Sequence, residues 1–343
     1  MRIAQIAPLS SSVPPKAYGG TQLIVHILTE ALIRRGHEVT LFASGDSITS
    51  AELVPGSKYE LKDSNIPVRT RHMLSMANVL DCLERAGEFD IIHNHSFPEG
   101  LAMAGLSGTP TLTTFHENLN GMGDLFLKYR GWYNTVSHSQ KTCLPDKERY
   151  VGTVYNAINC DSFPFSDNDD REGYLLFLAS LLPYKGAHIA IEVAQRLQRK
   201  LVIAGNINEE FRDYFRDEIE PKIDGKLIHY FGEANQAQKR ELLVRADCLL
   251  APIDWEEPFG LQFIEAMVCG TPPVAFNKGA VPEIIDNGKT GFIVDGIEAM
   301  VAAVKNISWI DRIACRQHVE QNFDAPIMVQ NYLDVYEHIF ERK

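Results

Sequence analysis

The sequence contains no apolar run of about 18 residues, the length that a membrane-spanning helix requires. Its first residues, MRIAQIAPLSSSVPP, change to serine and proline after a few apolar positions, which is unlike a secretory signal. We therefore expect a cytoplasmic protein. At 343 residues, with 45% hydrophobic and 23% charged residues, the composition is typical of a soluble globular protein with two domains.

Cysteine is sparse and follows neither a disulfide pattern nor a metal-binding pattern. The six cysteines lie far apart without a Cys-x-x-Cys pair, so reduced thiols are the simplest interpretation. His93 and His95, in IIHNHS, lie on one face of an expected strand and could form a metal pair. Because no third ligand follows at a suitable spacing, we expect no metal site.

Basic residues are too few for a general nucleic-acid-binding face. The net charge is −12, and most of it lies after residue 165. Nucleic-acid binding needs a basic surface, so we expect no such partner. The nearly neutral first half suits an anionic acceptor better. Within it, residues 58–74 are locally basic; peripheral membrane contact is one interpretation, and a solvated loop and helix is the simpler one.

The sequence does contain two successive series of alternating strands and helices. In the first half, apolar runs predict strands at 2–8, 37–44, 89–95 and 109–116, with a helix at 21–36. In the second half, they predict strands at 174–180, 200–205, 226–232, 247–253 and 271–276. Continuous apolar strands between helices indicate parallel sheets covered on both faces, hence an α/β fold.

A polar segment at 160–173, which contains Pro164 and several acidic residues, marks the expected domain boundary. We predict a first α/β domain at 1–160 and a second at 161–325. An amphipathic helix at 326–343 follows, and it could pack on either domain, including back on the first.

Glycine and lysine stand at two predicted strand-to-helix junctions, where parallel α/β sheets bind ligands on helix N-termini. Gly19 and Gly20 would let a phosphate approach the backbone, although a plain tight turn is the alternative. Lys185 and Gly186 would bring an ammonium and a helix terminus to one diphosphate; a surface lysine beside a glycine cap is the alternative. No Gly-x-Gly-x-x-Gly occurs, which disfavours a nicotinamide dehydrogenase.

Two further junctions carry a histidine and a pair of glutamates. His116 ends the predicted strand at 109–116, where a neutral imidazole could bond a sugar hydroxyl or act on a leaving group. In EEPFGLQFIEAM, a helix is expected to begin near Phe259 and Gly260. Glu265 would point back toward that helix start and needs a partner, because an unpaired buried carboxylate is very unfavourable. With Glu257, it suits a ligand with hydroxyl pairs.

The stretch EEPFGLQFIEAMVCGTPPVAFNKGAVPEIIDNGKTGFIVD resembles the donor-site signature of glycosyltransferase family four. Glu257 and Glu265 meet its glutamate spacing, and Gly279, Pro282 and Glu283 meet its Gly-x-x-Pro-Glu turn. The Gly-Gly loop, FDIIHNH, TTFHEN, VSHSQK and PYKG extend the resemblance over almost the whole chain. It implies the GT-B fold, two Rossmann-like parallel α/β domains facing each other across a cleft, and retaining transfer from a nucleotide sugar.

The resemblance also implies roles for single residues. Glu265 would hold the ribose hydroxyls, and Lys185 with the Gly19-Gly20 turn would neutralise the diphosphate. His116 would bond the sugar near its C6 hydroxyl. Glu257 would contact the transferred sugar and the phosphate, together with the backbone N–H groups of Phe259, Gly260 and Leu261.

Glu257, His116 and Lys185 are thus the expected catalytic residues, and Tyr18 and His95 mark the expected acceptor side. The family usually has arginine five residues before the lysine, whereas this chain has Ser180 there. Arg212 or Lys239 could supply the missing positive charge.

We therefore expect a metal-independent, retaining transferase without a cofactor. It would move a hexose from a nucleoside diphosphate sugar, UDP-linked by preference, to a hydroxyl of a sugar, glycolipid or small molecule. A nucleotide-sugar epimerase of the same fold and a catalytically weak sugar-nucleotide binding protein are the alternatives.

Overall fold

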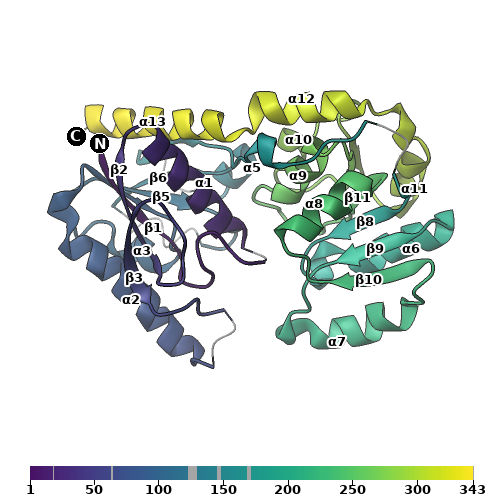
Figure 1. Cartoon of the computed structure of the whole chain (residues 1–343), viewed down its shortest axis with the longest axis horizontal. Helices are drawn as coiled ribbons and strands as arrows, with labels where there is room; N and C mark the ends of the chain where they lie inside the picture. The colour runs from purple at the N-terminus through teal and green to yellow at the C-terminus, as the bar shows by residue number, and fades with distance from the viewer. Residues whose placement is uncertain (18, 63–64, 123–129, 145–147, 168–170, 343) are drawn as a thin grey trace. The chain divides into compact units, whose positions relative to one another are not determined.

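The computed structural model describes residues 1–17, 19–62, 65–122, 130–144, 148–167 and 171–342. The chain divides into two compact units, and each contains one parallel β-sheet (Figure 1). The first unit is Met1–Ala157 together with Ala325–Lys343, and the second is Ile158–Asp324. The two parallel sheets agree with the α/β architecture predicted from the alternating strands and helices.

The first unit has a sheet with the strand order β3-β2-β1-β4-β5-β6-β7. Its strands are β1 (Arg2–Ile6), β2 (Glu38–Ser44), β3 (Glu52–Ser57), β4 (Ile91–Asn94), β5 (Thr111–Phe115), β6 (Trp132–Thr135) and β7 (Tyr150–Thr153). Its helices are α1 (Gly20–Arg34), α2 (Val68–Glu84), α3 (Glu99–Met103), α5 (His138–Lys141) and α13 (Ala325–Glu341).

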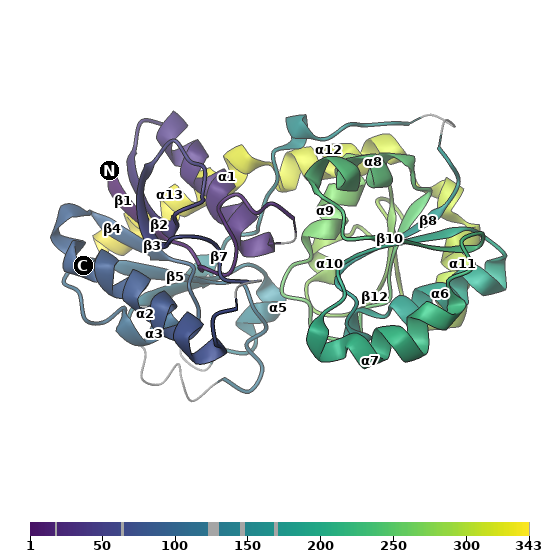
Figure 2. The same cartoon turned by 60° about the horizontal axis from the view of Figure 1, so that its bottom comes forward.

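Helices cover both faces of the first sheet. Val79 and Cys82 of α2 pack against Ala4 and Ile6 of β1 in one apolar cluster. On the opposite face, Val25 of α1 packs with residues of β2. Figure 2 shows α2 on the other side of the sheet from α1 and α13.

The terminal helix α13 packs on the first unit. It contacts α1 and β7, and it buries a stripe at helical spacing, formed by Ala325, Met328, Val329, Tyr332, Val335, Tyr336 and Ile339. Arg35, which follows α1, donates to the side chain of Gln330 at 2.7 Å and to the carbonyl of Pro326 at 3.1 Å. The last helix of the chain thus completes the cover of the first sheet.

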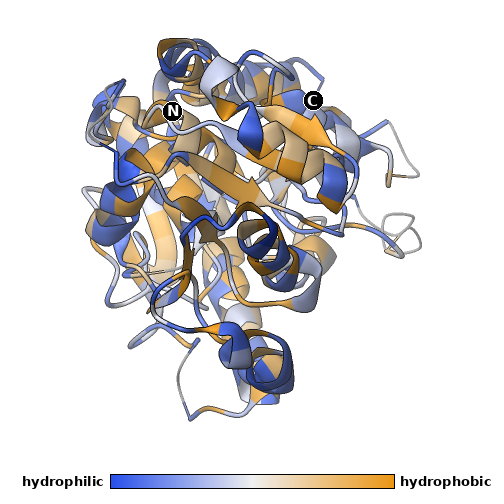
Figure 3. Ribbon diagram, turned by 90° about the vertical axis from the view of Figure 1, so that its right-hand side faces the viewer, coloured by the Kyte–Doolittle hydropathy of each residue, from blue (hydrophilic) through white to orange (hydrophobic). Residues whose placement is uncertain are grey.

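The second unit has a sheet with the strand order β10-β9-β8-β11-β12-β13. Its strands are β8 (Leu175–Leu178), β9 (Leu201–Ala204), β10 (Ile228–Gly232), β11 (Cys248–Ala251), β12 (Pro273–Phe276) and β13 (Phe292–Val294). Its helices are α6 (Ala187–Leu197), α7 (Arg212–Tyr214), α8 (Gln236–Arg245), α9 (Leu261–Val268), α10 (Val281–Ile284), α11 (Ile297–Lys305) and α12 (Arg312–Asn322). Figure 3 shows apolar residues concentrated on the strands and polar residues on the helices around them.

Short helical turns connect these elements at Ala86–Glu88, Cys160–Ser162, Pro183–Lys185, Glu209–Phe211, Phe215–Ile219, Glu220–Lys222 and Ile307–Trp309. In the described part of the chain, no helix is both long enough and apolar enough to cross a membrane.

Both sheets reverse their strand order at one internal position. The reversal lies between β1 and β4 in the first sheet and between β8 and β11 in the second. In open parallel sheets, loops leave such a switch point in opposite directions, and a crevice forms beyond the carboxyl ends of the strands. The loops after β1, β4, β8 and β11 are therefore the places where a ligand site is expected.

Candidate functional site

The loop after β8 presents Lys185. A helical turn at Pro183–Lys185 ends in Gly186, whose φ of 81° is in the left-handed region. A Cβ atom at Gly186 would lie 2.2 Å from the carbonyl oxygen of Pro252, so this loop packs directly against the segment that follows β11. Lys185 is consequently buried, with 8% of its surface exposed.

Lys185 meets Glu257 across that contact. The Lys185 Nζ lies 2.5 Å from Glu257 Oε2, and the indole N–H of Trp255 donates to the same oxygen at 2.9 Å. The ammonium also lies 4.5 Å from the centroid of the Trp255 ring, a cation–π contact. The structure thus brings together two of the three predicted catalytic residues, and it pairs them with each other.

Glycines hold the Glu257 segment in place. Gly279 has a φ of 55°, and a Cβ atom there would lie 2.3 Å from the backbone nitrogen of Glu257. The next residue, Ala280, donates its N–H to the Glu257 carbonyl at 2.9 Å. The Gly-x-x-Pro-Glu turn singled out in the sequence therefore supports the backbone of the catalytic candidate.

Gly260 precedes α9 as its N-cap residue and lies next to Glu257. Its φ is 89°, and a Cβ atom would lie 2.5 Å from the ring of Phe263 and 3.4 Å from Glu257 Cγ. Leu261 is the first residue of α9, so the free backbone N–H groups of the helix start beside Glu257. This arrangement matches the expected helix start near Phe259 and Gly260.

The buried carboxylate of α9 has a basic partner. Glu265 is 3% exposed and forms an ion pair with Lys239 of α8, whose side chain is 14% exposed. The expectation that Glu265 needs a partner is thus confirmed. The sequence did not identify this partner, because Lys239 lies on a different helix, before β11.

Ser180 does not replace the missing arginine by itself. Its hydroxyl donates to the side-chain oxygen of Asn206 at 2.7 Å. Of the two proposed substitutes, Arg212 is exposed and paired with Glu209, whereas Lys239 is the partner of Glu265. Lys239 is therefore the better placed of the two to add positive charge next to a predicted nucleotide-binding residue.

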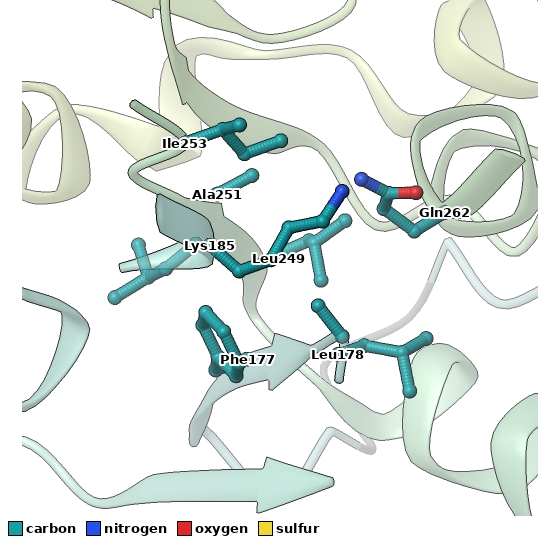
Figure 4. A pocket seen from close by; sticks show the side chains of 9 residues that line it. Phe177, Leu178, Lys185, Leu249, Ala251, Ile253 and Gln262 are labelled. Atoms are coloured by element: carbon teal, nitrogen blue, oxygen red, sulfur yellow. The ribbon is translucent and has the colours of Figure 1, made fainter. Parts of the chain in front are cut away.

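A small pocket opens beside Lys185 in the second unit (Figure 4). Its walls come mainly from β8 and β11, and the amide of Gln262, in the first turn of α9, points into it together with the Lys185 ammonium. The pocket lies where the sheet reverses its strand order. Its lining residues are Phe177, Leu178, Ala179, Lys185, Leu249, Leu250, Ala251, Ile253 and Gln262.

The glycine pair of the first unit lies at the start of α1. Gly20 is the first helical residue, and a Cβ atom at Gly19 would lie 2.7 Å from Pro15 Cβ. The first turn of α1 has no acidic residue, so it does not repel an anion. Gln22 instead ties this turn to the β1 loop by donating to Ser10 at 2.8 Å. Tyr18, predicted for the acceptor side, lies outside the described residues.

His95 and His116 lie together at the carboxyl ends of β4 and β5. His95 Nδ1 is 2.9 Å from His116 Nε2, and the two rings stack with their centroids 5.2 Å apart. Burial lowers the pKa of His116 to about 4 and the pKa of His95 well below 6.5. Both imidazoles are therefore neutral at pH 7, the form in which they can bond hydroxyl groups.

His93 uses both ring nitrogens for hydrogen bonds, whereas a metal pair would need one of them as a ligand. Both of its ring nitrogens form hydrogen bonds, Nδ1 with the hydroxyl of Tyr336 and Nε2 with that of Thr114, each at 2.7 Å. The sequence missed these partners, because Thr114 lies on another strand and Tyr336 on the distant helix α13. The available signal was the polar His93 itself, which follows Ile91 and Ile92 within a buried strand.

Two family models match the chain. The model described as glycosyl transferases group 1 matches residues 161–321, and the one described as glycosyltransferase family 4 matches residues 18–143. The first therefore covers the loops that carry Lys185 and Glu257, and the second covers Gly19, His95 and His116.

Relatives match over nearly the full length. An uncharacterized glycosyltransferase of Methanocaldococcus jannaschii is 26% identical, over 97% of this chain and 94% of that protein. A glycogen synthase of Mycobacterium tuberculosis is 24% identical over the same shares. The structure of HepE from Anabaena, solved in complex with UDP and glucose, has a TM-score of 0.77 at 19% identity, over 98% of this chain and 100% of that chain. This last likeness shows a shared fold.

Proposed function

Because the chain belongs to glycosyltransferase family four and has its two-domain GT-B fold, we propose that it transfers a hexose from UDP to an acceptor hydroxyl with retention at C1. Relatives named glycosyltransferase and glycogen synthase support glycosyl transfer as the reaction class. The UDP and glucose bound by HepE support UDP as the nucleotide.

The observation that carries this proposal is the cluster of Lys185, Glu257 and Trp255 beside the start of α9. An ammonium and free helix N–H groups stabilise a diphosphate, whereas a carboxylate accepts hydrogen bonds from sugar hydroxyls. Without ligand, Lys185 and Glu257 neutralise each other. A nucleotide sugar would divide them, with Lys185 binding the phosphates and Glu257 binding the sugar.

The same groups would favour the transition state. Cleavage of the bond between the sugar and the diphosphate leaves positive charge on the sugar ring and adds negative charge to the leaving phosphate. Lys185 and the N–H groups of Phe259, Gly260 and Leu261 would stabilise that negative charge. Glu257 would stabilise the oxocarbenium-like sugar, and Glu265, held by Lys239, would bind the ribose hydroxyls.

We also propose that this chemistry needs no divalent metal ion, since fixed positive groups already face the expected position of the diphosphate. The test is transfer from UDP-glucose with and without a chelator such as EDTA. Equal rates are expected, and complete loss with EDTA that magnesium restores would contradict the proposal.

The decisive experiment combines calorimetry with product analysis. UDP-glucose should bind, and the protein should release UDP and form an α-linked glucoside when candidate acceptors are supplied. Conversion of the donor without any acceptor would indicate an epimerase instead. Binding without turnover across sugar, glycolipid and small-molecule acceptors would indicate a sugar-nucleotide binding protein. For residues 58–74, cosedimentation with anionic vesicles distinguishes peripheral membrane contact from the simpler interpretation, a solvated loop and helix.

A further inference from the structure

A chain of hydrogen bonds crosses one face of the first sheet beneath α13. It links side chains of four neighbouring strands, β1, β4, β5 and β6, with a tyrosine of α13. The register explains why they meet, because Gln5 pairs with His93 and Thr114 pairs with Asn134, and paired residues point to the same face. The members of this series are buried, with between 0% and 2% of their surface exposed: Gln5, His93, His95, Thr114, Asn134 and Tyr336.

This series of hydrogen bonds has a defined donor-to-acceptor direction, because a backbone carbonyl fixes the orientation of the side chain at one end. Asn134 donates its side-chain N–H to the carbonyl of Thr135 at 3.2 Å, so its oxygen is the atom that faces Thr114. The Thr114 hydroxyl donates to that oxygen at 2.6 Å. Its lone pair must then accept from Nε2–H of His93, which lies 2.7 Å away.

The direction continues through Tyr336. A neutral imidazole with its proton on Nε2 has an accepting Nδ1, so the Tyr336 hydroxyl donates to His93 Nδ1 at 2.7 Å. The Tyr336 oxygen in turn accepts from the side-chain N–H of Gln5 at 3.4 Å. Gln5 is thereby oriented with its amide oxygen toward His95 Nε2, 2.8 Å away.

The series of hydrogen bonds ends at His116. Since Gln5 offers only an oxygen, His95 must carry its proton on Nε2, and its Nδ1 must accept. The group that donates to it is His116 Nε2–H, at 2.9 Å. His116 Nδ1 is then unprotonated, and no hydrogen bond from the described residues reaches it.

The charge states required by this scheme agree with the burial of the groups. Burial lowers the pKa of His93 and His95 well below 6.5 and that of His116 to about 4, so all three rings are neutral at pH 7. Burial raises the pKa of Tyr336 well above 10, so its hydroxyl keeps the proton that it donates.

We propose that this chain of hydrogen bonds holds His116 in the Nε2–H tautomer, so that its Nδ1 accepts a hydrogen bond from a ligand hydroxyl. Gln5, His95 and Tyr336 are then positioning residues that act through His116. The ligand part of this inference rests on the proposed function and on the role that the family resemblance implies for His116, a hydrogen bond to the transferred sugar near its C6 hydroxyl. An acceptor at this position selects a hydroxyl and disfavours an oxyanion, which has no proton to donate.

The tautomers are measured without any ligand, from the imidazole nitrogen shifts of protein containing isotope-labelled histidine. In the wild type, His93, His95 and His116 should all be Nε2–H tautomers at neutral pH. Tyr336→Phe removes the link between His93 and Gln5, so the Gln5 amide can rotate and the second tautomer should appear at His95 and His116. An Nδ1–H tautomer at wild-type His116 overturns the proposal, even if Tyr336→Phe does not fold.

Tyr332→Phe is the matched control. Tyr332 is equally buried and lies one helical turn before Tyr336. Its hydroxyl lies 3.3 Å from that of Thr114 and also bonds the side chain of Asn134, and its ring contacts His93, so it does not link His93 to Gln5 as Tyr336 does. Its substitution should leave the tautomers of His95 and His116 unchanged. Equal tautomer shifts in both variants would mean that Tyr336 does not direct the chain.

The ligand part is tested with UDP-glucose and its 6-deoxy and 6-deoxy-6-fluoro analogues. Fluorine can accept a hydrogen bond but cannot donate one, so both analogues should lose roughly tenfold in kcat/KM, equivalent to one hydrogen bond. Retained activity of the fluoro analogue alone would make His116 a donor and overturn the inference. Failure to use UDP-glucose at all would refute the proposed donor, while the tautomers would still decide the hydrogen-bond chain.

Discussion

Glu257→Gln should strengthen nucleotide binding while it abolishes most of the transfer. The Glu257 carboxylate accepts hydrogen bonds from Lys185 at 2.5 Å and from Trp255 at 2.9 Å, and its side chain is 10% exposed. An amide keeps an accepting oxygen but loses the charge that balances the buried Lys185 ammonium, so the free energy of unfolding should fall by about 3 kcal/mol. Glu257→Ala, which leaves the buried ammonium without a partner, should cost about 3–5 kcal/mol.

The opposite effects on binding and transfer follow from electrostatics. Two unit charges 4 Å apart interact by about 4 kcal/mol at an effective dielectric constant of about 20. Removing the negative charge beside Lys185 should therefore strengthen UDP binding, by roughly tenfold after screening. Transfer from UDP-glucose should fall at least roughly 100-fold, because the sugar loses a charge that stabilises its transition state.

Calorimetry with UDP and a transfer assay measure these two quantities on the same preparation. Glu256→Gln is the matched control, since it makes the same change in charge at the adjacent, exposed position. The control should leave UDP affinity and transfer nearly unchanged. Unaltered UDP affinity together with near-normal transfer in Glu257→Gln would refute the role given to the Lys185–Glu257 pair.

Lys185→Ala should weaken UDP binding at least roughly tenfold by calorimetry, and an unchanged dissociation constant would exclude Lys185 from the diphosphate site. Glu265→Gln should weaken UDP binding roughly tenfold but leave 2′,3′-dideoxy-UDP unaffected; an equal loss for both nucleotides would contradict ribose binding. Gly260→Ala should lower the melting temperature, because its Cβ atom would lie 2.5 Å from Phe263 at a φ of 89°; wild-type melting would show that the loop adapts. Because burial lowers the pKa of His116 from 6.5 to about 4, protonation favours the unfolded chain between these values. The neutral His116 imidazole therefore contributes at most about 3 kcal/mol to the free energy of unfolding, which is present above pH 6.5 and lost as pH falls toward 4. In urea unfolding, the stability of His116→Asn should depend less on pH than that of the wild type, and an identical pH dependence would contradict this.

The α/β class of both units could be predicted from the sequence, because short strand segments rich in apolar residues alternate with amphipathic helices. In the second unit the central strands are continuous apolar runs, whereas those of the first unit also contain polar residues such as Gln5 and His93. The runs at 174–180 and 247–253 became β8 and β11, and the loops after them carry Lys185 and Glu257. The glycines at 186, 260 and 279 were also visible as motif positions. The structural reason for these glycines, a left-handed backbone in tight contact with another segment, becomes visible only in the folded structure.

Local patterns therefore determined which residues lie at the ends of strands and at the starts of helices, since these depend on neighbours a few positions away. The tertiary structure decided which of them become partners. Lys185 lies 72 residues from Glu257, and His93 lies 243 residues from Tyr336. Such contacts depend on strand order, on register and on the return of α13 to the first sheet. The periodicity of a segment contains no information about the distant residue that will cover it.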